Sequence, residues 1–367
     1  MVFLCSLSFF ISLLVGMLVV RKVRGHAGRY GYAKPQRFHV GDVPRLGGAA
    51  IFIGLLCGWV AAVVAFQFEN TGFLGIDLTV AAGWTAITLP ALIGGVVEDL
   101  TQRLTVRYRL LLTGLSGALA ISLMRIGMQR LGLPSLDGAL LAVPWLGLAL
   151  AFLGVTGLPH AFNIIDGYNG LAGMVALVAC LALTYVALQV GDRQLAGILL
   201  CLAGATGGFL VWNYPRGMLF AGDGGAYLWG VVIAVASLLL VHRHDQVSPW
   251  FPLLLLIYPV WETLFSIYRK LMRGTSPSVA DALHFHQLIY RRIVHGVFHD
   301  DDSRRILMRN NRTSPYLWAF TMLTVVPALL FWRNTEVLMG FCALFVLSYV
   351  AAYMMIIRFK VPAWLRR

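Results

Sequence analysis

The chain has 367 residues, of which 59% are hydrophobic and 12% are charged. Soluble domains carry about 25% charged residues, so this composition excludes an ordinary water-soluble surface. It also excludes a disordered chain, which needs low hydrophobicity and much charge. Lys and Arg outnumber Asp and Glu by 29 to 16, and in membrane proteins such an excess reports topology and contact with anionic lipid.

Eleven apolar runs are long enough to cross about 30 Å of hydrocarbon. In chain order they are 2–20, 46–66, 78–97, 109–125, 140–158, 170–190, 194–212, 225–241, 249–267, 315–332 and 336–357. Basic residues follow the first run and do not precede it, which is the reverse of a signal peptide, so we expect a retained helix. The predicted fold is all-α, a single transmembrane domain over 1–367 with about 11 spanning helices.

The distribution of basic residues predicts the orientation. If the N-terminus is outside, the cytoplasmic segments are 21–45, 98–108, 159–169, 213–224, 268–314 and the tail 358–367. These segments, with Arg109 at a helix end, hold 24 of the 29 Lys and Arg residues. Because cytoplasmic loops collect basic residues, we expect the N-terminus outside and the C-terminus in the cytoplasm.

Acidic residues mark the same face. Glu98 and Asp99 end the third run, and Glu262 lies in the ninth run near its cytoplasmic end. Carboxylates are expensive in apolar segments, about 2.5–3.5 kcal/mol at mid-membrane, so they are functional candidates there. The basic loop KPQRFHVGDVPRLGG, which contains Arg45, has two interpretations: an anchor on anionic lipid or a substrate contact.

Two glycine-rich motifs each carry an acid before an apolar helix. NIIDGYNGLAG contains Asn163, Asp166 and Asn169, and FAGDGGAYLWG contains Asp223. Glycine lets the backbone approach a ligand closely, and N–H groups at a helix start face anions. An acid beside such a turn could hold Mg²⁺ together with phosphate oxygens. The plainer alternative is that each acid caps a helix.

The segment RGTSPSVADALHFH combines Arg273, Asp281, His284 and His286. A zinc site is disfavoured because no cysteine or further histidine stands at ligand spacing. The surrounding arginines favour contact of the two imidazoles with an anionic phosphate or sugar, with an ordinary polar amphipathic segment as the alternative.

Taken in order, these five motifs resemble one family, the polyprenyl-phosphate N-acetylhexosamine-1-phosphate transferases, relatives of phospho-N-acetylmuramoyl-pentapeptide transferase. HVGDVPRLGG, VEDLTQRLTVRYRL, NIIDGYNGLAG, FAGDGGAYLWG and RGTSPSVADALHFHQL each match one of its motifs, over residues 34–292. Glu98, Asn169 and Gln287 depart from the residues usual there. These departures favour the branch that initiates O-antigen or exopolysaccharide over the peptidoglycan branch, which stays an alternative.

The resemblance implies a Mg²⁺-dependent transferase, with Mn²⁺ as an alternative ion, in a bacterial inner membrane with its active site facing the cytoplasm. The enzyme would transfer N-acetylhexosamine 1-phosphate from UDP-GlcNAc or a deoxy-amino-sugar analogue to undecaprenyl phosphate, giving undecaprenyl-diphosphate-sugar and UMP. That reaction starts O-antigen or another cell-surface glycan. Nucleic acid has no part in it, and a homodimer is left open.

The resemblance also implies roles for particular residues. Asp223 binds the metal ion. The catalytic residues are Glu98, Asp99, Asp166, His284 and His286. The substrate-binding residues are Arg45, Asn163, Asn169, Arg273 and Asp281.

A different class of function, an ion-coupled transporter, also uses intramembrane acids and glycine-broken helices. Transporters place such acids near the midplane and often contain paired repeats. Here the acids gather toward one side and the sequence has no visible repeat, so the transferase is preferred.

Overall fold

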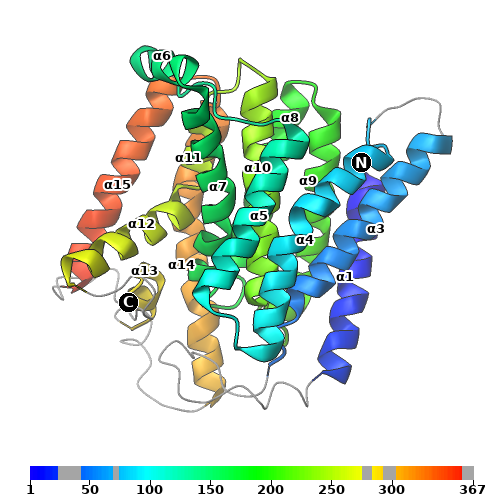
Figure 1. Cartoon of the computed structure of the whole chain (residues 1–367). Coiled ribbons are helices and arrows are strands. Elements are labelled where there is room, and N and C mark those ends of the chain that lie inside the picture. Colours follow the sequence, from blue (N-terminus) through cyan, green and yellow to red (C-terminus); the bar gives the residue numbers. More distant parts are fainter. Residues whose placement is uncertain (24–42, 69–73, 275–282, 292–302, 358–367) are drawn as a thin grey trace.

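The computed structural model describes residues 1–23, 43–68, 74–274, 283–291 and 303–357, and within them the chain folds into a bundle of helices (Figure 1). The helices are α1 (Val2–Lys22), α3 (Gly47–Phe68), α4 (Leu78–Thr101), α5 (Val106–Met124), α6 (Pro134–Ala142), α7 (Pro144–Ile165), α8 (Leu171–Gln189), α9 (Arg193–Asn213), α10 (Gly222–Arg243), α11 (Trp250–Leu255), α12 (Ile257–Met272), α13 (Phe285–Ile289), α14 (Ser303–Leu330) and α15 (Thr335–Ile357). Of those in the described ranges, ten are long and apolar enough to cross a bilayer, which confirms the all-helical polytopic fold.

Helix α10 is the centre of the bundle. It packs against α3, α4, α7 and α8, and almost every residue along it is buried. Gly230 lets it lie directly on α7, since a Cβ there would be 2.3 Å from the Cα of Pro159. Helix α10, which begins at the Gly-Asp motif, is therefore packed on several sides, and these contacts fix the position of its first turn.

Successive helices run in alternating directions, so their ends gather on two faces. In Figure 1, α4, α7 and α9 run toward the lower end, and α5, α8 and α10 return from it. The connections 102–105, 166–170 and 214–221 consequently meet at that end, together with the start of α3. This face collects three of the motifs that the sequence analysis singled out, and the side of the membrane it occupies stays a prediction.

Acids at the other end of the bundle have structural roles. Asp77 Oδ1 accepts a hydrogen bond from the Val80 N–H at 2.8 Å, and Asp192 Oδ1 accepts one from the Leu195 N–H at 2.9 Å. Each therefore caps a helix and satisfies an N–H that has no partner inside the helix. Their contacts separate them from the acids of the lower face.

The ninth expected span, 249–267, is not one helix. It breaks at Leu256 into α11 and the longer α12, and α12 runs obliquely outward from the bundle toward the lower end of α15 (Figure 1). Pro259 lacks an N–H and so cannot donate to the carbonyl of Leu255, as a continuous helix would require. The break places the inner face of α12, including Glu262, against α15.

Candidate active site

The carboxylate of Asp99 joins the paired-acid motif to the Gly-Asp motif. Asp99 is 2% exposed. Its Oδ1 accepts the N–H of Asp223 and its Oδ2 that of Gly224, both at 2.9 Å. The first N–H groups of a helix have no partner within it and carry partial positive charge, so a carboxylate stabilises them strongly. Asp99 therefore fixes the first turn of α10, and with it Asp223.

Backbone segments approach one another closely at this point. Phe220 donates its N–H to the carbonyl of Pro44, and Gly47 and Gly48 donate theirs to the carbonyls of Phe220 and Ala221, each at 2.9 Å. Gly222 has a φ of +69°, and a Cβ there would lie 2.3 Å from the carbonyl oxygen of Arg45. Glycine is needed here because no side chain fits between the two backbone segments.

The same contacts bring Arg45 beside the acids. The carbonyl oxygen of Arg45 and the carboxylate of Asp99 both lie against Gly222. The Arg45 charge also acts on Asp166 in the connection after α7. The basic loop, the paired acids and the Gly-Asp motif, which are far apart in the sequence, therefore share one site.

Asp223 has one oxygen engaged and one available. Arg109 of α5 pairs with Oδ2 at 2.9 Å, and the Tyr227 hydroxyl donates to the same oxygen at 3.3 Å. Oδ1 has no hydrogen-bond partner in the described part of the chain, and the side chain is 15% exposed. Asp223 can therefore bind a ligand through Oδ1 while Arg109 holds its position.

Asp166 lies in the connection between α7 and α8, next to Asp223. Burial raises the pKa of Asp166 to about 7, the positive charge of Arg45 opposes that rise, and the negative charge of Asp223 adds to it. Asn163 closes the end of α7 through its carbonyl, which accepts the Asp166 N–H at 3.3 Å. Asp166, Asp223 and Arg45 therefore lie near enough to influence one another.

Glu98 and Asn169 both make contacts within the protein. Glu98 Oε2 accepts the N–H of Leu104 at 2.8 Å and so shapes the turn before α5. Asn169 is 1% exposed, its side chain donates to Asn311 Oδ1 at 2.9 Å, and its own N–H donates to Asn310 Oδ1 at 2.8 Å. Asn169 lies against α14, and its hydrogen bonds attach the connection between α7 and α8, which contains Asp166, to that helix.

The two histidines stand beside the Asp166 connection. Their rings are parallel with centroids 5.4 Å apart, and His286 also meets the Tyr168 ring edge-on at 5.6 Å. A Cβ on Gly167 would lie 3.2 Å from His286 Nε2. Burial raises the pKa of Tyr168, which keeps its hydroxyl neutral. The histidine motif and the Asn-Asp-Gly motif are thus in direct contact.

Two predicted site residues lie apart from this cluster. Arg273 is exposed at the end of α12, where its N–H donates to the carbonyl of Lys270 at 3.1 Å. Asp281 is outside the described residues. The arrangement therefore brings together Arg45, Asp99, Asp166, Asp223 and His286 most closely.

The donor set suits a hard cation that binds few protein ligands. Within the described ranges, no three His, Cys, Asp or Glu side chains come together as a metal cage. Zinc would need such a cage, whereas Mg²⁺ takes one or two carboxylates and completes its shell with phosphate oxygens and water. The open Oδ1 of Asp223, with Asp166 nearby, fits that second pattern.

Arg109 and Glu262 contact candidate site residues, Asp223 and His284, and no motif assigned them a role. Arg109 follows the paired acids within VEDLTQRLTVRYR, and its spacing from them was the available signal. Glu262 was visible as an acid in an apolar run, but its partners were not. Asn213 gave no signal, yet its side chain links the Gly170 N–H at 2.6 Å to the carbonyl of Leu219 at 2.8 Å.

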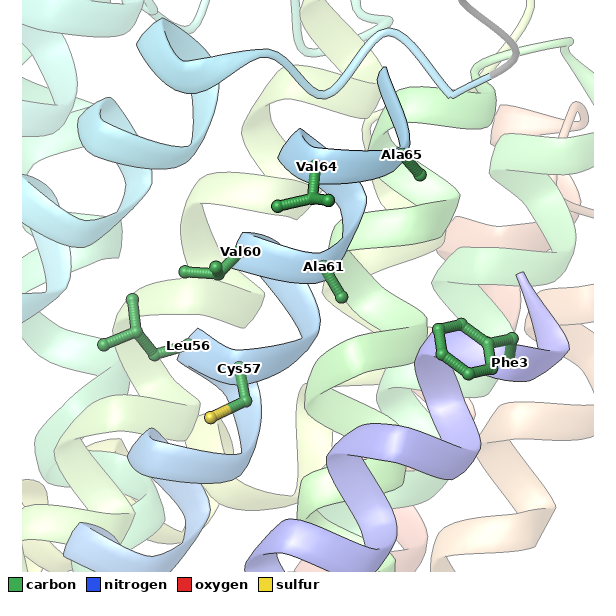
Figure 2. A pocket seen from close by; sticks show the side chains of 7 residues that line it. All are labelled: Phe3, Leu56, Cys57, Val60, Ala61, Val64 and Ala65. Atoms are coloured by element: carbon green, nitrogen blue, oxygen red, sulfur yellow. The ribbon is translucent and has the colours of Figure 1, made fainter. Parts of the chain in front are cut away.

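An apolar groove between α1 and α3 lies away from these residues. It encloses about 600 Å³ and is lined by Phe3, Leu56, Cys57, Val60, Ala61, Val64 and Ala65 (Figure 2). Val60 stands roughly 20 Å along α3 from Gly47, given a rise of about 1.5 Å per residue. With no charged lining residue, this groove is not the chemical site.

Comparison with known proteins finds one family and several relatives with similar descriptions. The sequence profile of glycosyl transferase family 4 matches residues 80–241, from α4 to α10. A Bacillus subtilis protein described as a probable undecaprenyl-phosphate N-acetylglucosaminyl 1-phosphate transferase is 27% identical over 296 residues, which cover 80% of this chain and 78% of the relative.

Two further relatives carry similar descriptions. An undecaprenyl-phosphate alpha-N-acetylglucosaminyl 1-phosphate transferase of Thermotoga maritima is 26% identical, over 70% of this chain and 72% of its own length. A decaprenyl-phosphate N-acetylglucosaminephosphotransferase of Mycolicibacterium smegmatis is 27% identical, over 73% of this chain and 70% of its own. All three match most of the chain and not one segment alone.

Proposed function

We propose that this chain, a member of glycosyl transferase family 4 related to the polyprenyl-phosphate N-acetylhexosamine-1-phosphate transferases, transfers N-acetylglucosamine 1-phosphate from UDP-GlcNAc to a polyprenyl phosphate. The observation that carries the proposal is the cluster of Asp99, Asp166 and Asp223 with Arg45 and Arg109 at one end of a membrane-spanning bundle. A lipid-linked phosphate and a water-soluble nucleotide can meet only at such an end.

In the proposed reaction, an oxygen of the lipid phosphate attacks the β-phosphorus of UDP-GlcNAc. The bond from that phosphorus to the bridging oxygen of UMP breaks, so the products are lipid-diphosphate-GlcNAc and UMP. Both reactants are anions, and phosphoryl transfer depends on positioning and on neutralising charge. Arg109 pairs with Asp223, and the positive charge of Arg45 acts on Asp166, so both arginines supply positive charge at the site.

Asp166 and Asp223 are the residues we propose to hold Mg²⁺. The ion would neutralise diphosphate charge and favour departure of UMP. Arg109, which contacts only Oδ2 of Asp223, leaves Oδ1 for that role. An ion beside Asp166 would also favour its charged form, which burial disfavours in the free protein.

We propose that Asp99 positions the start of α10 and does not act as a base. Both of its oxygens accept backbone N–H groups, which ties the carboxylate to the start of α10. No base is required, because the second pKa of a phosphate monoester is about 6 and the nucleophile is already mostly ionised at pH 7. Asp99 keeps the α10 terminus, and so Asp223, in place.

The test is release of UMP from UDP-GlcNAc by purified protein with undecaprenyl phosphate, with and without Mg²⁺. We expect release to need both the lipid and the ion, and Asp223→Asn to abolish it. The matched control is Asp245→Asn, an exposed acid at the other end of the bundle. Full activity of folded Asp223→Asn would refute the metal assignment, and no UMP from the wild type with UDP-GlcNAc would refute this donor.

A further inference from the structure

Glu262 is a buried acid that the proposed reaction does not use. It lies on α12 and is 0% exposed. Oε1 accepts the Phe285 N–H at 3.0 Å and lies 3.0 Å from His284 Nδ1, and Oε2 accepts the Tyr349 hydroxyl at 2.9 Å. An isolated buried carboxylate is costly, so three partners from α13, its preceding residue and α15 indicate a specific arrangement.

The contact to His284 determines which ring nitrogen carries hydrogen. A carboxylate is an acceptor, so His284 Nδ1 must be protonated to bond to it. In the neutral ring, Nε2 is then the acceptor, and in the charged ring both nitrogens donate. Apart from the capping-box contact of its side chain with the Gln287 backbone N–H, His284 makes no hydrogen bond through Nε2 in the part of the chain that the structure describes.

The ring also has a fixed direction. His284 lies parallel to His286, and His286 packs against Tyr168 and Gly167 of the Asp166 connection. The backbone N–H of His284 also donates a hydrogen bond to Oε1 of Gln287 at 3.3 Å. Glu262 thus fixes one edge of the imidazole, and the stacked neighbours fix its plane beside the acidic cluster.

We propose that Glu262 is a positioning residue, which holds His284 by Nδ1 so that Nε2 is presented to the phosphate groups of the substrates. The inference rests on the proposed transferase function and adds a residue to that site. A positioned group gains most of its effect from restricted orientation, so losing the constraint lowers turnover more than binding.

The kinetic test is a double-mutant cycle of Glu262→Gln and His284→Asn in the purified full chain. We expect Glu262→Gln to lower kcat by about 10- to 100-fold with little change in the KM for UDP-GlcNAc. In the His284→Asn background, which lacks Nε2, the same change is expected to cost nothing more. Equal losses of kcat in both backgrounds would overturn the proposal. They would show that Glu262 only stabilises the packing of α12 against its neighbours.

Tyr349→Phe is the matched control. It removes a hydrogen bond from the other oxygen of Glu262 without touching His284. If Glu262 acted only by tying α12 to α15, this variant would lose as much activity as Glu262→Gln. We expect it to keep kcat within about threefold of the wild type.

A second readout does not depend on activity. In protein labelled with ¹⁵N-histidine at pH 8, we expect His284 Nδ1, assigned by its absence in His284→Asn, to show the shift of a protonated ring nitrogen. An unprotonated Nδ1 would refute the positioning contact, whatever the enzyme's substrate. Wild-type protein that releases no UMP but shows the protonated Nδ1 would count against the transferase proposal and for the Glu262 contact.

Discussion

Asp99, Asp166 and Asp223 carry the same carboxylate but differ in what surrounds it. Asp99 uses both oxygens to accept backbone N–H groups, Asp223 shares one oxygen with Arg109, and Asp166 is partly buried within the electrostatic influence of Asp223. The different contacts predict different consequences when each acid is replaced by its amide. These consequences separate an acid that supports the site from acids that bind its ligand.

Asp99→Asn should lower stability as well as activity. The amide has a single acceptor oxygen, so one of the two N–H groups at the α10 terminus is left unpaired in a buried place, at a cost of about 1–3 kcal/mol. Glu98→Gln is the control, because an amide oxygen can still accept the Leu104 N–H. Thermal unfolding of both variants in the same detergent checks this. An Asp99→Asn protein that is inactive yet as stable as the wild type would indicate a chemical role.

The raised pKa of Asp166 predicts that the stability of the metal-free protein depends on pH. Its pKa is raised from the ordinary value near 4 to about 7, so the folded state binds the proton more tightly than the unfolded state. The stability due to this group is present below pH 4 and is lost as the pH rises through 7.

Asp166→Asn removes that loss, because the amide stays neutral. Without divalent ions, we expect the variant to gain melting temperature relative to the wild type as the pH is raised from 5 to 8. Added Mg²⁺ should narrow the gap at pH 8 by stabilising the wild type alone. A gap that does not change with pH would show that Asp166 keeps an ordinary pKa.

At the scale of elements, the site depends on how closely α3, α4 and α10 approach one another. A Cβ on Gly48 would lie 2.2 Å from the backbone N of Gly225, and one on Gly95 would lie 2.4 Å from that of Gly224. Backbone atoms on both sides cannot move away as a flexible side chain could. The three helices therefore have one geometry in which Asp223 sits over Asp99.

Gly48→Ala is expected to disrupt this junction. Inserting a methyl group into a packed site costs about 1–3 kcal/mol, and here the clash is with backbone. Gly154→Ala in α7, where no atom lies within 4 Å of the added Cβ, should instead be neutral or stabilise by about 0.5–1 kcal/mol. The yield of monodisperse folded protein and its melting temperature distinguish the two. Equal behaviour would mean that the junction is looser than its distances indicate.

For the whole molecule, the alternating helices separate two ends with different contents. The ends of α4 and α7 and the starts of α3 and α10 lie at the lower end in Figure 1, and these segments carry or adjoin Asp99, Asp166, Asp223 and Arg45. At the other end, Asp77 and Asp192 cap helices. In the proposed reaction the donor carries a nucleotide and approaches from water, so that proposal requires the lower end to face the compartment that contains the donor. Basic residues predict that this compartment is the cytoplasm.

Cysteine labelling in intact cells tests the orientation. Arg216 is exposed in the connection between α9 and α10, and Asp245 is exposed after α10. We expect a membrane-impermeant maleimide to label Asp245→Cys in intact cells and Arg216→Cys only after the membrane is opened. The native cysteines, which are partly or fully buried within helices, give the background in wild-type cells. The opposite pattern would reverse the predicted topology.

The sequence by itself determined the class of protein, most helix positions and the motifs of the site. Apolar length is a local property, so the runs at 2–20 and 225–241 could be found residue by residue and were confirmed as helices. Asp99, Asp166 and Asp223 were found because acids are rare in apolar surroundings. The break at Leu256 was missed because Pro259 stands inside a run that is mostly apolar and long enough to span a membrane.

Only the tertiary structure decided what each polar group contacts. Asp99 holds the start of α10, Asn169 bonds to α14, and Glu262 bonds to His284 and Tyr349, each through partners distant in the sequence. The physical reason is that a hydrogen bond depends on distances of about 3 Å and on direction, and these arise when helices pack. Composition and spacing name the groups in the site, and helix packing determines which of them remain open to a ligand.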